Sequence, residues 1–136
     1  MMLADAALKF IGTPYRHQGR TPGIGLDCAG VLICAMRKLG IAVNDCRTYG
    51  RVPPRNLLTD MIERHGFIQQ KEVSNDGDLC LFWMRHKRLV IHCGIATNDQ
   101  RELIHVEDGR KVERTPIGIW RPQLAGVYRL PRSGTW

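Results

Sequence analysis

A cysteine at the start of an apolar segment is the first residue of this chain that could do chemistry. The stretch GIGLDCAGVLICAMRKLG, residues 23–40, runs from a glycine-rich loop through Asp27 and Cys28 into a helical pattern. Asp27 is a good N-cap, which places Cys28 in the first helical turn. The N–H groups and dipole of a helix N-terminus favour thiolate over thiol, and the same N–H groups can stabilise an oxyanion. A buried structural cysteine is an equal alternative from this position alone.

A thiolate nucleophile needs a base, and two histidines interrupt apolar segments with the pattern of strands. His92 lies in RLVIHCGIAT and His105 lies in ELIHVED. A lone histidine in a strand is more often a core residue than a catalyst, but two on one hairpin favour a shared site. If the turn centres on Asn98-Asp99, the two histidines pair directly, with Cβ atoms about 5 Å apart on one face.

The same register assigns the neighbours of His92 to the two faces of the strand. Gly94 shares the face of His92 and leaves room above the imidazole, whereas Cys93 points into the core and is structural. A slip by one residue would put the two histidines on opposite faces. The predicted constellation is a cysteine on a helix, a histidine base and a second histidine that orients it, as in papain-like enzymes.

The elements that must position these residues follow from the hydrophobic pattern. Helices are predicted at 3–12, 28–39 and 55–65, and a loop rich in glycine and proline at 13–26. After Gly77 the pattern predicts short strands, at 78–84, 88–97, 102–108, 111–117 and 124–130. Helices followed by an antiparallel meander indicate an α+β fold, and a length of 136 residues suits a single domain over 1–136.

Composition narrows the class of protein. The net charge is +7, from 20 Lys and Arg against 13 Asp and Glu, which favours contact with something anionic, such as nucleic acid or a cell-wall polymer. The basic residues are dispersed, so a nucleic-acid module is not predicted. No apolar run reaches the roughly 20 residues of a membrane span, and the N-terminus lacks the pattern of a signal peptide. The five cysteines form no CxxC pair, so the sequence predicts no disulfide framework, no metal site and no cofactor.

Four motifs together resemble those of the NlpC family of cysteine peptidases. GTPYRHQGRTPGIGLDCAGVL is similar to the family's Pro-Tyr and glycine loop leading to Asp-Cys-Ser-Gly. GDLCLFW, HCGIA and LIHVEDG are similar to the three strands that follow it, in the same order. The resemblance runs from about Gly12 to Arg129. Ala29 replaces the usual serine and Gln18-Gly19 the usual paired glycines, departures that bear on substrate specificity.

The resemblance implies a papain-like α+β fold with N-terminal helices packed on an antiparallel sheet. It also implies cleavage of an amide bond in the stem peptides of bacterial peptidoglycan, typically after D-glutamate and before a diamino acid. It assigns Cys28 as the nucleophile, His92 as the general base and His105 as the third polar residue. Tyr15 matches a tyrosine near the nucleophile that helps the oxyanion site. Asp27 matches the acidic residue before the nucleophile and is expected to cap the helix.

The absence of a wall-binding repeat makes the chain similar to single-domain members encoded among bacteriophage tail genes. This similarity implies phage tail proteins as partners, synthesis in the bacterial cytoplasm and delivery in the virion tail. Two other functions fit the same motifs. The chain could be a tail-assembly or tail-tip structural protein that keeps the fold, or a papain-like amidase or acyltransferase that acts on another amide.

Overall fold

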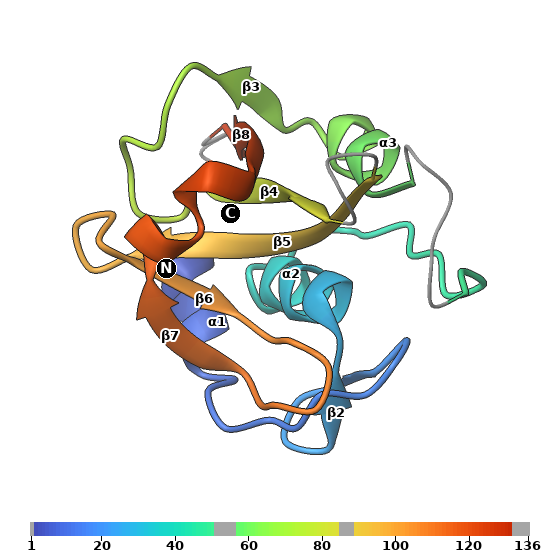
Figure 1. Ribbon diagram of the computed structural model, residues 1–136. Coiled ribbons are helices and arrows are strands. Elements are labelled where there is room, and N and C mark those ends of the chain that lie inside the picture. Colours follow the sequence, from blue (N-terminus) through green and yellow to red (C-terminus); the bar gives the residue numbers. More distant parts are fainter. Residues whose placement is uncertain (1, 51–56, 85–88, 132–136) are drawn as a thin grey trace.

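A computed structural model describes residues 2–50, 57–84 and 89–131, with the backbone alone for 89–91 (Figure 1). The helices are α1 (Leu3–Leu8), α2 (Cys28–Lys38) and α3 (Leu57–Arg64), followed late in the chain by two short 3-10 turns, η1 (Ile117–Ile119) and η2 (Arg121–Gln123). The strands are β1 (Arg20–Thr21), β2 (Gly25–Leu26), β3 (Ile68–Gln70), β4 (Leu79–Met84), β5 (Leu89–Thr97), β6 (Glu102–His105), β7 (Glu113–Pro116) and β8 (Leu124–Arg129).

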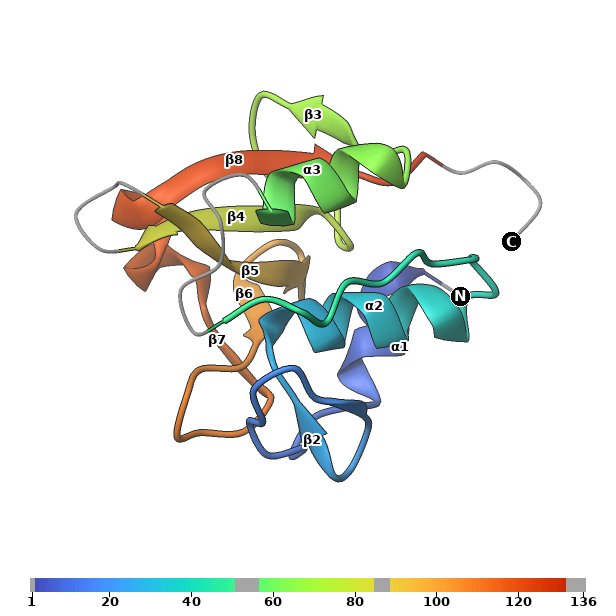
Figure 2. The same ribbon diagram turned by 90° about the vertical axis from the view of Figure 1, so that its right-hand side faces the viewer.

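Six of the strands form one antiparallel sheet, in the order β3-β8-β4-β5-β6-β7. The remaining pair, β1 and β2, forms a small separate hairpin just before α2. Figure 2 shows α1 and α2 together on one side of the sheet, and α3 contacts β5. The α+β architecture with helices packed on an antiparallel sheet is therefore the predicted one.

Two hydrophobic clusters lie on opposite faces of this sheet. The larger one joins α1 and α2 to residues such as Leu79, Ile95 and Ile104. The smaller one consists of Cys80, Phe82, Leu103, Ile117 and Trp120, from β4, β6 and the 3-10 turns. Because β4 is buried on both faces, its sequence LCLF is apolar throughout instead of alternating.

The predicted helices and strands differ from the observed ones mainly at their ends. The helix from Cys28 begins where predicted and ends one residue early, at Lys38. The first helix ends at Leu8 instead of residue 12, and the predicted start of the third lies outside the described residues. The predicted loop at 13–26 contains β1 and β2, and β3 was not predicted, because strands of two or three residues carry too little pattern.

The predicted direct pairing of His92 with His105 is wrong. The β5–β6 ladder pairs Ile95 with Ile104 and Thr97 with Glu102, which displaces the register by two residues. The cause is the turn: Asn98, Asp99 and Gln100 all have positive φ, near 53°, 55° and 62°. A shift of two residues preserves the faces, so the two histidines remain on the same face as diagonal neighbours.

The carboxylate of Asp76 holds this longer turn. It accepts hydrogen bonds from the backbone N–H groups of Asp99 and Gln100, at 3.3 and 3.0 Å, and from the side-chain amide of Gln100 at 2.7 Å. Asp76 lies in the loop before β4, so its side chain fixes the β5–β6 turn from outside the hairpin. The sequence of the turn alone therefore could not predict this contact.

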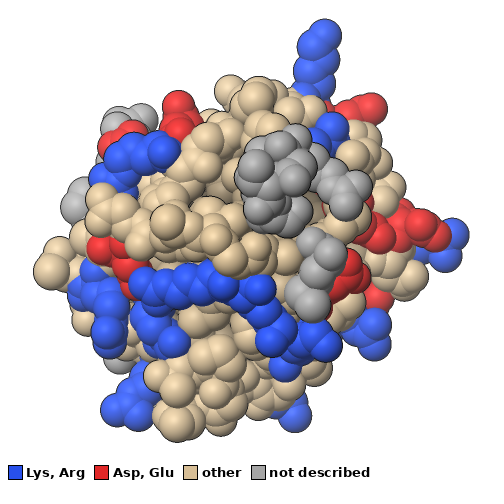
Figure 3. Space-filling model, turned by 180° about the vertical axis from the view of Figure 1, so that it is seen from behind, with Lys and Arg blue, Asp and Glu red and all other residues tan. Residues whose placement is uncertain are grey.

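The basic excess of the sequence appears on the surface. Figure 3 shows Lys and Arg side chains crossing the lower half of the face opposite to that of Figure 1, with acidic side chains on both flanks. No helix in the described part of the chain is long and apolar enough to cross a membrane.

Candidate active site

Cys28 is the first residue of α2, and Asp27 caps this helix. The Asp27 side chain accepts a hydrogen bond from the backbone N–H of Gly30 at 2.8 Å, and it is almost completely buried. A buried acceptor at this position satisfies a helical N–H group that has no partner within the helix. The cap fixes the direction in which the first turn, and with it Cys28, enters the site.

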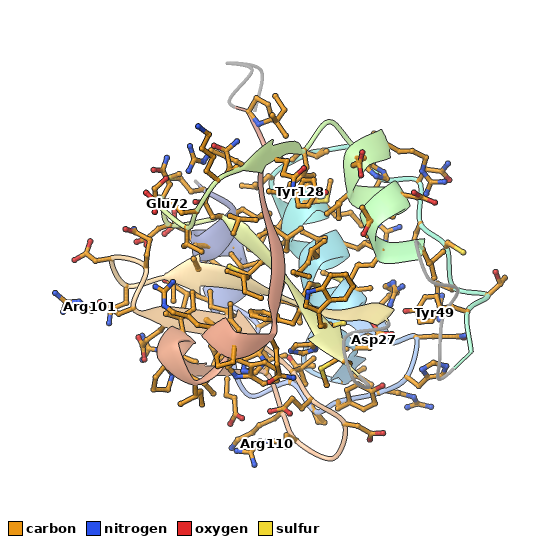
Figure 4. The ribbon with its side chains drawn as sticks, turned by 45° about the horizontal axis from the view of Figure 1, so that its top comes forward. Asp27, Tyr49, Glu72, Arg101, Arg110 and Tyr128 are labelled. Atoms are coloured by element: carbon orange, nitrogen blue, oxygen red, sulfur yellow. The ribbon has the colours of Figure 1, made fainter. Side chains whose placement is uncertain are left out.

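A buried ion-pair network holds the cap in place. Arg20 donates to Asp27 at 2.9 Å, to Asp45 at 2.8 Å and to the hydroxyl of Tyr49 at 2.8 Å. Tyr49 in turn donates to Asp27, and these two side chains lie side by side in Figure 4. Burial lowers the pKa of Arg20, but the hydrogen bond to Asp45 and the charge of Asp27 together raise it by more. The net shift is upward, so the guanidinium stays charged. Three separate segments are thereby joined at the start of α2.

His92, His105 and Thr115 form a hydrogen-bonded relay across β5, β6 and β7. His92 Nε2 lies 2.9 Å from His105 Nδ1, and His105 Nε2 lies 2.8 Å from the hydroxyl of Thr115. Because Nε2 of His92 is engaged, the hydrogen bond of His92 with Cys28 is left to Nδ1. The two residues in each hydrogen bond are diagonal neighbours on adjacent strands. Thr115 is the last member of the relay.

His105 is held neutral in this relay. Its side chain is 1% exposed, and burial, followed by the charge of His92, lowers its pKa from the ordinary 6.5 to about 4. A neutral His105 that donates from Nε2 to Thr115 has an unprotonated Nδ1, which accepts from His92 Nε2–H. That tautomer leaves Nδ1 of His92 free to take a proton from Cys28.

Aromatic rings enclose the two histidines. The Trp120 ring stacks on His92, with centroids 5.0 Å apart and planes at 27°, and meets His105 edge-on at 5.0 Å. The ring centroids of Phe82 and His92 are 5.9 Å apart. The predicted room above Gly94 does not exist, because a Cβ there would lie 2.5–2.8 Å from the side chain of Leu103. The absence of a side chain at Gly94 therefore makes room for Leu103, which shields the histidine pair on this side.

The electrostatic environment of Cys28 favours the thiolate. Its pKa is lowered first by a hydrogen bond from Cys93 and then by the hydrogen bond and charge of His92, while burial opposes the shift. Cys93 is 2% exposed and faces the larger core, as the sequence indicated, but it also contacts Cys28. The pKa of Cys93 is raised well above its ordinary value, first by its hydrogen bond to Cys28 and then by burial.

A cavity of about 790 Å³ opens in front of Cys28. Tyr15 lines it on one side, where its backbone N–H donates to the carbonyl of Arg110. Leu58 and Met61 of α3 give the cavity an apolar wall, while Glu107 and Asp108 contribute acidic groups. The cavity can therefore hold an extended polar chain against an apolar surface, with its reacting bond beside the sulfur of Cys28.

Four residues of the site lay outside the sequence-based prediction: Arg20, Tyr49, Thr115 and Trp120. Arg20 is one of many dispersed arginines, and Tyr49 lies in a segment with no secondary structure. Thr115 is an ordinary strand residue, and its alignment with His105 depends on the β6–β7 register. Of the four, Trp120 had the clearest signal in the sequence, because a tryptophan between two turns often packs against a hydrophobic core.

The comparisons with known proteins identify the family of the chain. Residues 12–129 match the NlpC/P60 family. The chain is 25% identical over 122 residues to murein DD-endopeptidase MepH of Escherichia coli, a match that covers 88% of this chain and 42% of MepH. A solved NlpC/P60 family protein from Bacillus cereus is 27% identical with a TM-score of 0.69, over 94% of this chain and 40% of that protein.

A third relative matches along nearly its whole length. The NlpC/p60 domain of the peptidoglycan hydrolase SagA has a TM-score of 0.65 at 23% identity, over 94% of this chain and 96% of that domain. By contrast, the chain spans less than half the length of MepH and of the Bacillus cereus protein. Since the family match extends over most of the 136 residues, this chain belongs to the NlpC/P60 family.

Proposed function

We propose that the protein is a cysteine peptidase that hydrolyses an amide bond in the stem peptides of peptidoglycan. One observation carries the proposal: a thiol at a capped helix N-terminus is hydrogen-bonded to a histidine whose other nitrogen is held by a buried, neutral histidine. This arrangement combines a nucleophile, a base and an orienting group. Membership of the NlpC/P60 family and the names of MepH and SagA support the choice of substrate.

The reaction begins with transfer of the Cys28 proton to Nδ1 of His92. The thiolate attacks the amide carbonyl, and the N–H groups at the start of α2 stabilise the oxyanion, with Tyr15 as a further candidate donor. His92 then protonates the leaving amine and the acyl-enzyme forms. Water, activated by the same histidine, releases the acid. His105 accepts from Nε2 of His92 throughout and holds the ring in this orientation.

The bond we propose is that between D-glutamate and a diamino acid, as the motifs of the NlpC family imply. The acidic side chains of Glu107 and Asp108 at the cavity are compatible with a substrate that carries free amino groups. The relative MepH, named a murein DD-endopeptidase, gives a second bond to test, that between two D-residues of a cross-link.

The test uses purified protein and two defined substrates. A monomeric muropeptide contains the D-glutamyl bond, and a cross-linked dimer also contains a D–D bond. Mass spectrometry of the products identifies which bond is cut, and Cys28→Ala serves as the inactive control. Cleavage of either substrate by the wild type but not by Cys28→Ala supports a peptidase. If neither is cut by a folded protein, the peptidase is refuted, and a tail structural role or action on another amide takes its place.

Delivery by a phage tail remains part of the proposal. It takes up the resemblance to single-domain members encoded among phage tail genes, with phage tail proteins as the partners. Detection of the protein in purified virions, by mass spectrometry of tail fractions, is the corresponding measurement.

A further inference from the structure

Cys93 is a buried thiol in contact with the candidate nucleophile. Its Sγ donates to the backbone carbonyl of Cys28 at 3.5 Å, and the Cys28 and Cys93 thiols also shift each other's pKa, downward at Cys28 and upward at Cys93. The two cysteines are 65 positions apart in the sequence and meet where α2 packs against β5. The proposed hydrolysis uses Cys28 and His92, and it assigns no chemical step to Cys93.

The two sulfurs differ in the ways that favour sequential oxidation. Cys28 is partly exposed and lines the cavity, so a small solute can reach it, whereas Cys93 is 2% exposed. The surroundings favour the thiolate at Cys28 and the protonated thiol at Cys93. An accessible thiolate is the sulfur that oxidants attack first, and a neighbouring thiol can then resolve the product as a disulfide.

The other three cysteines do not share this arrangement. The Cys34 thiol donates to the carbonyl of Arg20 at 3.3 Å, and Cys46 pairs with the hydroxyl of Thr48 at 3.4 Å. Cys80 is fully buried in the smaller cluster on the other face of the sheet, where burial raises its pKa. Each of them therefore provides a comparison for the pair at the helix N-terminus.

We propose that Cys28 and Cys93 form a reversible disulfide when the protein meets a peroxide. The Cys28 thiolate attacks one peroxide oxygen, so that an S–O bond forms, the O–O bond breaks and hydroxide leaves. The Cys93 sulfur then attacks the Cys28 sulfur, the S–O bond breaks, and the oxygen leaves as water with the Cys93 proton. The two sulfurs together lose two electrons to the peroxide, and a dithiol reductant returns both thiols.

The disulfide protects the nucleophile from irreversible oxidation. Without a resolving thiol, a sulfenic acid at Cys28 would react with more peroxide and reach the sulfinic acid, which thiol reductants do not reverse. That the disulfide also stops hydrolysis rests on the proposed function. The oxidation chemistry itself does not, because it needs only the two sulfurs and the peroxide.

The test treats the folded, full-length protein with hydrogen peroxide and reads intact mass and non-reduced peptide maps. The wild type is expected to lose about 2 Da, to give a peptide that links Cys28 to Cys93, and to recover its mass with dithiothreitol. Cys93→Ala is expected to gain about 32 Da at Cys28, and dithiothreitol should not reverse the gain. Cys34→Ala is the matched control and should behave as the wild type does.

The wild-type peptide map decides the outcome even if Cys93→Ala fails to fold, and Cys93→Ser gives a second variant. Stable sulfinic acid at Cys28 in the wild type, or a disulfide between another pair, overturns the proposal. The readout is mass, so it is independent of turnover. A protein that cleaves muropeptides but forms no link refutes only this inference, and one that forms the link but cleaves nothing refutes only the peptidase.

Discussion

Mild acid should destabilise the protein through His105. This side chain is 1% exposed, and its pKa is about 4 in the folded protein against 6.5 ordinarily. At a pH between these two values the His105 imidazole binds a proton in the unfolded chain but not in the folded one. Folding stability is therefore fully present above pH 6.5 and falls as the pH drops toward 4. The two pKa values give a loss of about 2 kcal/mol between pH 7 and pH 5, and a limit of about 3 kcal/mol at lower pH.

Urea unfolding at the two pH values measures this loss, and a substitution isolates it. In His105→Asn the amide oxygen can accept from Nε2 of His92 and the amide N–H can donate to Thr115, but the side chain does not titrate. The wild type should lose about 2 kcal/mol more than His105→Asn between pH 7 and pH 5. Equal losses in the wild type and His105→Asn would refute a buried neutral His105.

The remaining predictions concern turnover, metal and the cap. His92→Ala should lower turnover on a muropeptide by roughly 10²–10⁴-fold. His105→Ala should lower it less, with much of the loss recovered in His105→Asn or Asp; wild-type turnover in His105→Ala would disprove the relay. Thr115→Val leaves His105 Nε2 without its acceptor, so urea unfolding should show a loss of about 1–3 kcal/mol, and an unchanged value would contradict the assigned tautomer. A chelator should leave turnover unchanged, whereas loss that zinc restores would indicate a metal enzyme. Arg20→Ala leaves Asp27 with an unpaired buried charge and should lower the free energy of unfolding by about 3–5 kcal/mol; a change below about 1 kcal/mol would show that the ion pairs contribute little.

Local pattern was sufficient to predict the elements that carry the site. The capped start of α2 at Cys28 follows from the Asp27 cap and the apolar stripe after it, and both histidines follow from polar residues within apolar strands. The exact register of β5 and β6 could not be predicted, because Asp76 fixes their turn from outside the hairpin. The faces were nevertheless predicted, since a shift by two residues conserves them.

Contacts between distant segments account for what the sequence did not reveal. The Arg20 network brings together three segments, and nothing in the local pattern of any one of them indicates the other two. The contact between Cys93 and Cys28 is of the same kind: the strand pattern predicted a core-facing thiol, but only the packing of α2 on β5 places it against Cys28.

The clamped turn between β5 and β6 also limits how the chain can change in length. Inserting one residue between Asn98 and Arg101 would rotate β6 by one pleat, so that Ile104 or Val106 would replace His105 beside His92, and His105 would enter the core under α1 and α2. Inserting or removing two residues would only slide β6 along its own face. Length variation in this turn therefore obeys a parity rule, and proteins that keep the histidine relay are expected to differ here by even numbers of residues.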